Sequence, residues 1–190
     1  MEKKSKTAAF FLKILRWKIG EDTPAPEPKV IILGVPHTSI IDFVISWLYY
    51  RAIGGKPYIM VKQEFFRWPI KRLLKSMGGI PVDRSIKGGA ALIKATVNEF
   101  NSRETFHVCI SPEGTRKAVN RWKKGFHRIA MEAGIPVYTG YFDFKTRTIG
   151  RGESFPLTGD ADADIANIRR WYKEKGVVGC HPNRFAHIED

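Results

Sequence analysis

The sequence has few cysteines and no apolar run long enough to cross a bilayer. Only Cys109 and Cys180 occur in 190 residues, so no disulfide framework is expected and a reducing cytosolic compartment is favoured. The apolar stretch 8–15 is interrupted by Lys13 and falls well short of the roughly 20 residues that a transmembrane helix needs. The same stretch is too short for a signal peptide, and no small-residue cleavage site follows it.

Acidic residues are also scarce relative to basic ones. The chain has 32 Lys and Arg against 19 Asp and Glu, which gives a formal net charge of +13. This balance favours an anionic partner, such as an anionic membrane, an acidic carrier protein or nucleic acid. Because no nucleic-acid-binding signature and no aromatic stacking array is visible, nucleic acid is not the expected partner. A hydrophobic content of 43% excludes a disordered chain and fits one folded domain.

Apolar, β-rich runs alternate with helical patterns from residue 29 onward. Strands are predicted at 29–35, 57–61, 79–83, 105–110, 135–143 and 146–151, and helices at 40–52, 65–77, 88–102, 124–133 and 164–175. The last two strands suit a hairpin. The alternation predicts an α/β fold with a mixed, mostly parallel central sheet flanked by helices.

Two basic helical segments point to a membrane surface. Residues 6–19 combine apolar and aromatic side chains at helical spacing with lysine and arginine, which is typical of an interfacial helix. The proline-rich stretch 23–28 predicts a semi-rigid spacer after it, so we divide the chain into a docking segment, 1–28, and a main domain, 29–190. The helix 65–77 is similarly basic, and both helices on one side would form a single docking surface. The alternative is that each helix simply packs on the domain.

The segment from His37 to Asp42 predicts a general base with a carboxylate that orients it. His37 follows a strand and Asp42 falls in the first turn of the next helix, from which it can reach back to the imidazole. A carboxylate on one ring nitrogen leaves the other nitrogen free to accept a proton. Alternatively, Ser39 and Asp42 form a capping box with no catalytic role.

A second charged segment, Pro112–Arg116, follows the strand at 105–110. Gly114 permits a tight turn and Arg116 offers a planar fork suited to a phosphate, while Glu113 orients Arg116 or accepts a hydrogen bond from a substrate hydroxyl. Lys62 and Arg84 also follow predicted strands. If these strands are neighbours, three cations converge near His37 as a phosphate pocket.

In these segments the chain resembles the glycerolipid acyltransferases, notably the 1-acyl-sn-glycerol-3-phosphate acyltransferases. Four blocks match in order between about residues 30 and 141, and together they are specific. The blocks are His37–Asp42, Gly79–Arg84, Pro112–Arg116 and Gly134–Val137. Pro36, Ser111, Lys117 and Thr139 depart from the usual family pattern.

The resemblance implies that His37 and Asp42 are catalytic and that an acyl thioester, of coenzyme A or acyl carrier protein, is the co-substrate. It further implies that Lys62, Arg84 and Glu113–Arg116, including Gly114 and Thr115, bind a lysophospholipid acceptor. No bound cofactor and no metal are required. The expected location is cytoplasmic, peripheral on the inner face of the cell membrane. Another acceptor, such as glycerol-3-phosphate or an amino-acid lipid, and a non-catalytic module that binds anionic lipid or nucleic acid stay open as alternatives.

Overall fold

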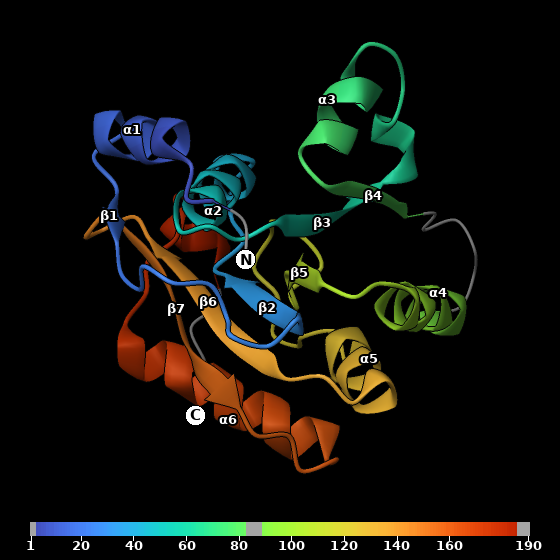
Figure 1. The fold of residues 1–190 in the computed structure, drawn as a ribbon. Coiled ribbons are helices and arrows are strands. Elements are labelled where there is room, and N and C mark those ends of the chain that lie inside the picture. The colour runs from blue at the N-terminus through green and yellow to red at the C-terminus, as the bar shows by residue number, and fades with distance from the viewer. Residues whose placement is uncertain (1–2, 83–88, 186–190) are drawn as a thin grey trace.

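The fold is a seven-stranded sheet covered by helices on both faces (Figure 1). A computed structural model describes residues 3–82 and 89–185. The strands are β1 (Lys18–Ile19), β2 (Lys29–Val35), β3 (Pro57–Lys62), β4 (Gly79–Val82), β5 (Phe106–Ile110), β6 (Val137–Asp143) and β7 (Thr148–Phe155). The α-helices are α1 (Lys6–Ile14), α2 (Ile41–Ala52), α3 (Ile70–Ser76), α4 (Gly89–Ser102), α5 (Gly125–Ala133) and α6 (Ala161–Lys175).

The order of strands across the sheet is β1-β7-β6-β2-β5-β3-β4. Only the β6–β7 hairpin is antiparallel among the pairings in the described part of the chain, and the others are parallel. The predicted α/β class with a mixed, mostly parallel sheet is therefore confirmed. None of the described helices combines the length and hydrophobicity that crossing a membrane requires.

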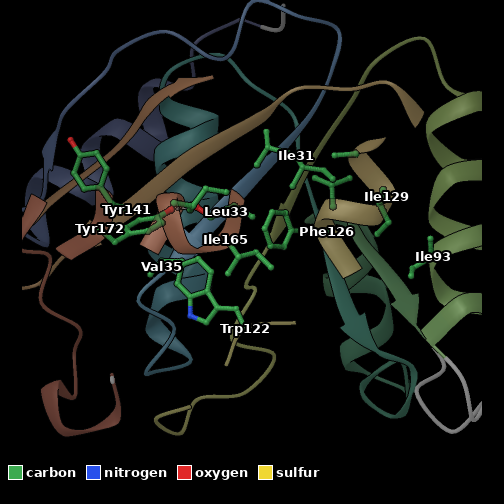
Figure 2. Packing of buried hydrophobic residues seen from close by; sticks show 14 of the residues in the cluster. Ile31, Leu33, Val35, Ile93, Trp122, Phe126, Ile129, Tyr141, Ile165 and Tyr172 are labelled. Atoms are coloured by element: carbon green, nitrogen blue, oxygen red, sulfur yellow. Dashed lines mark hydrogen bonds between the residues drawn. The ribbon is translucent and has the colours of Figure 1, made fainter. Parts of the chain in front are cut away.

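Strand β2 lies at the centre of the sheet and is buried on both sides. Its alternate residues Ile31, Leu33 and Val35 face the core that α4, α5 and α6 cover (Figure 2). The opposite face is covered by α1 and α2, which contribute Leu12 and Ile45 to a second core. The loop that leaves β2 at its carboxyl end is thus anchored by a strand that solvent does not reach.

The amino-terminal helix is shorter than predicted, because it ends at Ile14 instead of continuing to residue 19. Arg16 takes a left-handed conformation, with φ of 58°, and the Trp17 N–H donates to the Leu12 carbonyl at 2.8 Å. This hydrogen bond closes a Schellman-type helix end, and Trp17 packs into the same apolar cluster as Leu12. The chain then forms β1, which pairs with β7.

The proline-rich segment does not hold this helix away from the domain. Ala8 and Leu12 are buried in the cluster formed with α2, and Ala25 is buried beside Val30. The segment 1–28 is therefore packed on the sheet and on α2. Its role in membrane docking stays a prediction.

The predicted helix at 65–77 is also shorter in the structure. A 3-10 turn at Gln63–Phe65 precedes α3, which begins only at Ile70, with Pro69 as the residue before the helix. Proline has no backbone N–H and disfavours helical geometry in the residue that precedes it, so the helix cannot start earlier. None of the residues of α3 is buried.

A buried ion pair joins α5 to α6 beneath the sheet. His127 Nε2 lies 2.8 Å from Asp164 Oδ2, and the two side chains are 4% and 1% exposed. Burial acts to raise the pKa of the Asp164 carboxyl, but hydrogen bonds from His127 and Thr158 outweigh it and hold the pKa below its usual value. Both side chains are closed to solvent, so we assign the pair a role in the packing of α5 against α6.

Asp164→Asn is expected to lower the free energy of unfolding by about 3 kcal/mol, because removing one partner of a buried pair leaves the other uncompensated. Urea unfolding followed by circular dichroism measures the change. An unaltered midpoint would show that the pair contributes nothing to stability.

Candidate active site

The candidate active site lies where four parallel strands end side by side. Strands β2, β5, β3 and β4 are consecutive in the sheet, so the loops that follow them meet at one edge. His37 follows β2 and Glu113 follows β5, while Lys62 is the last residue of β3. The prediction that these strands are neighbours is confirmed. Only the backbone of Lys62 is described, and Arg84 lies outside the described residues.

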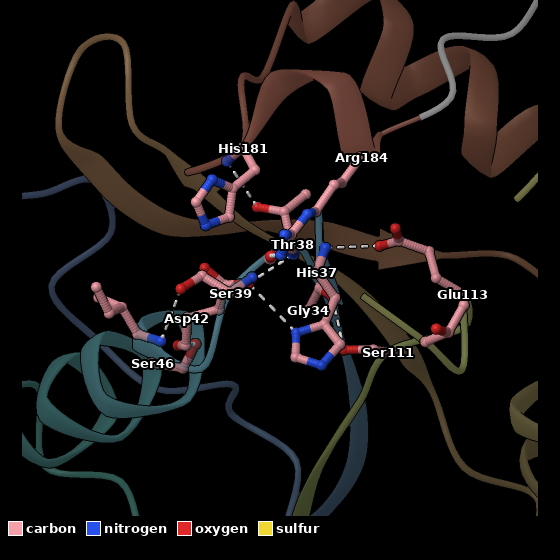
Figure 3. Close-up of polar contacts among 12 residues, drawn as sticks. Gly34, His37, Thr38, Ser39, Asp42, Ser46, Ser111, Glu113, His181 and Arg184 are labelled. Carbon is pink, nitrogen blue, oxygen red and sulfur yellow. Dashed lines mark hydrogen bonds and ion pairs between the residues drawn. The ribbon is translucent and has the colours of Figure 1, made fainter. Parts of the chain in front are cut away.

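The structure brings His37 and Asp42 together (Figure 3). His37 Nδ1 lies 3.3 Å from Asp42 Oδ2, and the same oxygen accepts hydrogen bonds of 2.7 Å from the backbone N–H groups of Thr38 and Ser39. The Asp42 side chain is 2% exposed, whereas that of His37 is 27% exposed. The carboxylate is therefore fixed by the backbone and faces Nδ1, which leaves Nε2 as the nitrogen that can accept a proton.

The helix-capping interpretation of this segment is also satisfied in part. Ser39 Oγ accepts a hydrogen bond of 3.2 Å from the Ile41 N–H, and Asp42 reaches back to the Ser39 N–H from the first turn of α2. The amino terminus of the helix favours the negative charge of the carboxylate. The predicted cap is not formed as such, because Ile40 is the N-cap of α2 and has no side-chain cap hydrogen bond. The Thr38 and Ser39 N–H groups hold Asp42 beside the imidazole.

Glu113 supports the same loop from the neighbouring strand. Its Oε1 accepts a hydrogen bond of 2.7 Å from the His37 backbone N–H, and the side chain is almost fully buried. Burial raises the pKa of the Glu113 carboxyl to about 7. The described part of the chain shows the Glu113 carboxyl paired with the His37 backbone and Arg116 exposed. The predicted roles of Glu113, orienting Arg116 or accepting a hydrogen bond from a substrate hydroxyl, stay predictions.

Glu113→Gln is expected to flatten the dependence of stability on pH. Because the folded protein holds the Glu113 proton up to about pH 7, the wild type should lose stability as the pH rises from about 4.5 to 7. The variant cannot ionise and should be more stable than the wild type at pH 8, by up to about 3 kcal/mol. Urea unfolding at pH 4.5 and pH 8 measures both values. Parallel pH profiles for the two proteins would contradict the assignment.

The turn after β5 has the shape that its sequence predicts. Gly114 has a positive φ of 69°, and its N–H donates to the Ser111 carbonyl at 3.1 Å, which closes a tight turn. The Thr115 hydroxyl accepts a weak hydrogen bond of 3.3 Å from the Lys117 N–H. Arg116 is exposed. Its role as a phosphate clamp, like the roles of Gly114 and Thr115, stays a prediction.

Sequence reasoning missed a carboxyl-terminal strap beneath the His37 loop. Thr38 is fully buried, its Oγ1 accepts a hydrogen bond of 3.2 Å from the His181 N–H, and Arg184 donates to its carbonyl at 3.4 Å (Figure 3). A Cβ on Gly179 would lie 2.7 Å from the Thr38 methyl group, so glycine is needed for this close approach. No local signal in the sequence links residues separated by about 140 positions.

A second missed feature is an apolar cavity between the sheet and α2. The cavity is partly open to solvent. Gly34, three residues before His37, and Ser46, one helical turn after Asp42, contribute to its wall. Other lining residues come from β3, β5, β6 and β7, so no single segment of the sequence reveals it. Within residues 3–82 and 89–185, no three His, Cys, Asp or Glu side chains are grouped in a way that could hold a metal ion.

The site thus pairs a histidine with a fixed carboxylate at the carboxyl edge of a mostly parallel sheet. Such a pair can activate a hydroxyl by accepting its proton. The profile of the family described as Acyltransferase matches residues 16–143, well over half of the chain. The chain therefore belongs to the acyltransferase family, as its sequence blocks indicated.

Known acyltransferases are similar to this chain in sequence and in structure. Human 1-acyl-sn-glycerol-3-phosphate acyltransferase beta is 23% identical over 170 residues, a region that covers 80% of this chain. The chain spans 60% of the length of that relative. The crystal structure of the 1-acyl-sn-glycerophosphate (LPA) acyltransferase PlsC from Thermotoga maritima matches with a TM-score of 0.57 and 17% identity, covering 93% of this chain and 79% of PlsC. At this identity the structural match establishes the fold alone.

Proposed function

We propose that the protein transfers a fatty acyl group from an acyl thioester to the free hydroxyl of a lysophospholipid. The acceptor proposed first is 1-acyl-sn-glycerol-3-phosphate, which would give phosphatidic acid. The observation that carries the proposal is the His37–Asp42 pair, partly open to solvent, in a chain of the acyltransferase family. Gly34 and Ser46, close to the pair in sequence, line an apolar cavity. Both similar proteins are named for this acceptor.

The proposed chemistry needs one base and no covalent intermediate. His37 Nε2 removes the proton of the acceptor hydroxyl while the oxygen attacks the thioester carbonyl. The carbon–sulfur bond then breaks, and the imidazolium returns the proton to the leaving thiolate. Asp42 stabilises the imidazolium that forms between these steps, because its carboxylate lies 3.3 Å from Nδ1. The acyl donor, coenzyme A or acyl carrier protein thioester, acts as a co-substrate.

The apolar cavity is the proposed place for an acyl chain. Its walls combine Leu33 and Gly34 of β2 with Ile59 of β3 and Phe142 of β6, and few polar atoms face the space. Tyr50 and His107 also contribute to its wall, where they satisfy one another with a 2.5 Å hydrogen bond between Tyr50 Oη and His107 Nδ1. An alkyl chain would therefore be buried without leaving a polar group unpaired.

Cations on three adjacent loops are the proposed phosphate-binding residues. Lys62 ends β3, Arg84 follows β4 and Arg116 lies on the loop after β5. These strands are consecutive and parallel, so their carboxyl ends lie at the same edge of the sheet as His37. Glu113, Gly114 and Thr115 would shape the turn that presents Arg116.

Arg116→Ala is expected to raise the KM for a phosphate-bearing acceptor by about 10- to 100-fold, the loss of a charge-assisted hydrogen bond. The kcat at saturating acceptor should change much less, because the residue binds the phosphate and leaves the reacting atoms untouched. Arg121→Ala is the matched control, since Arg121 is an exposed arginine five positions further along the chain. An unchanged KM in Arg116→Ala would remove this residue from the proposed clamp.

Peripheral attachment to the inner face of the cell membrane completes the proposal. Helices α1 and α3 are basic, and both expose apolar side chains. The net charge of +13 favours anionic lipid over zwitterionic lipid. A membrane location would bring the protein to an acceptor that is itself a lipid.

The deciding experiment incubates the purified protein with labelled acyl-coenzyme A or acyl carrier thioester and a panel of acceptors. We expect labelled phosphatidic acid from 1-acyl-sn-glycerol-3-phosphate. Label only in glycerol-3-phosphate or an amino-acid lipid would change the acceptor and keep the reaction. No transfer to any acceptor, together with tight and salt-sensitive binding of DNA in a mobility-shift assay, would favour a binding module instead.

A further inference from the structure

Exposed apolar side chains gather in three segments of the described chain. Twelve of the thirteen large apolar side chains that are exposed there fall within 10–19, 40–44 and 65–73. They are Phe10, Phe11, Ile14, Leu15, Ile19, Ile40, Ile41, Val44, Phe65, Trp68, Ile70 and Leu73. The thirteenth, Met131, lies on α5. Figure 1 shows α1, α2 and α3 on the upper side of the molecule, and α5 and α6 below the sheet.

The central segment is the first turn of α2, directly after His37. Ile40, Ile41 and Val44 are 64%, 47% and 41% exposed. Further along the same helix, Ile45, Leu48 and Tyr49 are buried in the domain, so the exposed apolar side chains are confined to its start. The core therefore covers the body of α2 and leaves three apolar side chains beside the candidate base largely open to solvent.

The flanking segments supply charge of one sign. Residues 3–19 contain six Lys and Arg and residues 65–77 contain four, and neither range contains Asp or Glu. All ten cations are exposed: Lys3, Lys4, Lys6, Lys13, Arg16, Lys18, Arg67, Lys71, Arg72 and Lys75. Asp42, in the first turn of α2, is buried and paired with His37. Exposed Glu64 and Asp22, which pairs with Lys4, border these ranges, so the rim is mainly basic. An apolar centre with a mainly basic rim is complementary to an anionic bilayer.

We propose that the first turn of α2 inserts Ile40, Ile41 and Val44 into an anionic bilayer, with the basic segments of α1 and α3 resting on the head groups at either side. This proposal rests on the proposed function and adds a location for the reaction. The inserted turn begins three residues after His37, so the imidazole lies at the depth of the lipid head groups. The hydroxyl of a lysophospholipid therefore reaches the base while its acyl chain stays in the membrane.

A vesicle-partition experiment tests the insertion. The double variant Ile40→Ser/Val44→Ser is expected to bind phosphatidylglycerol vesicles about tenfold more weakly than the wild type, because two apolar side chains no longer leave water. Met131→Ser is the matched control, since Met131 is a similarly exposed apolar residue on α5, and its binding should stay within about twofold. The difference between the double variant and the wild type should persist at about 0.5 M salt, where charge attraction is screened.

Insertion depth gives a second, positive readout. A tryptophan introduced by Val44→Trp should be quenched by lipids brominated on their acyl chains, in excess of the wild-type signal, while Met131→Trp should add no quenched signal. Equal binding of the double variant and the wild type, or no extra quenching at position 44, would overturn the proposal. Circular dichroism spectra that match the wild type exclude misfolding as the cause of weak binding.

The outcome is separable from that of the proposed reaction, because partition is measured without an acyl donor. If the protein inserts α2 but transfers no acyl group, the proposed function is contradicted and the proposed docking surface is supported. If the protein transfers acyl groups but Ile40→Ser/Val44→Ser does not weaken vesicle binding, the docking surface is contradicted and the proposed reaction is supported.

Discussion

Replacing His37 by alanine is expected to lower kcat for acyl transfer by about 10³-fold, the contribution typical of a positioned general base. The reason is that Nε2 is the proton acceptor, and neither Asp42 nor Glu113, both nearly fully buried, can take its place. Initial rates with labelled acyl-coenzyme A measure the loss. Stability should change little, because the imidazole is partly exposed and the backbone bonds of the loop persist in the variant.

His181→Ala is the matched control for this measurement. His181 is an exposed histidine beside the same loop, and it reaches Thr38 only through its backbone N–H. Its replacement should alter the rate by less than about threefold. Equal rates for His37→Ala and the wild type would take the imidazole out of the mechanism.

Asp42→Asn is expected to reduce kcat by about 10² to 10³-fold and also to lower stability by about 1–3 kcal/mol. An amide cannot stabilise the imidazolium as a carboxylate does, which lowers the rate. It also weakens the acceptor that serves the Thr38 and Ser39 N–H groups, which loosens the start of α2. Rates at saturating substrate and urea unfolding measure the two effects.

A double variant makes the Asp42 prediction sharper. If Asp42 acts through the imidazole, His37→Ala/Asp42→Asn should be about as slow as His37→Ala alone. Asp164→Asn is the control, because it breaks a buried His–Asp pair between α5 and α6 and should cost stability with no loss of kcat. Losses that multiply in the double variant would show that Asp42 acts independently of His37.

Local segments whose conformation depends on near neighbours were predictable from the sequence. The strand over 29–35 has the predicted bounds, and Gly134 ends α5 in a left-handed conformation as expected for a helix terminus. The Gly114 turn and the reach of Asp42 back to the loop were predictable for the same reason. Each depends on backbone preferences and side-chain chemistry within about five residues.

Predictions failed where a nearby residue of an unusual kind altered a regular pattern. The helix 6–19 had apolar residues at the right spacing throughout, but burial of Trp17 beside Leu12 favours a left-handed Arg16 and an early end. The helical spacing of apolar residues gives no information on the packing energy of a single tryptophan. Of the two interpretations given for the basic helix at 65–77, packing of its apolar stripe on the domain does not hold for Ile70 and Leu73, which are exposed.

The sequence by itself determined the α/β class, the pairing of His37 with Asp42 and the excess of positive charge, because these depend on residue type and short spacing. Only the tertiary structure decided that β2, β5, β3 and β4 lie side by side, that Glu113 supports the His37 backbone and that the carboxyl-terminal strap packs on Thr38. Those contacts join residues 76 to 143 positions apart. Their formation depends on burial summed over the whole sheet, which no local segment encodes.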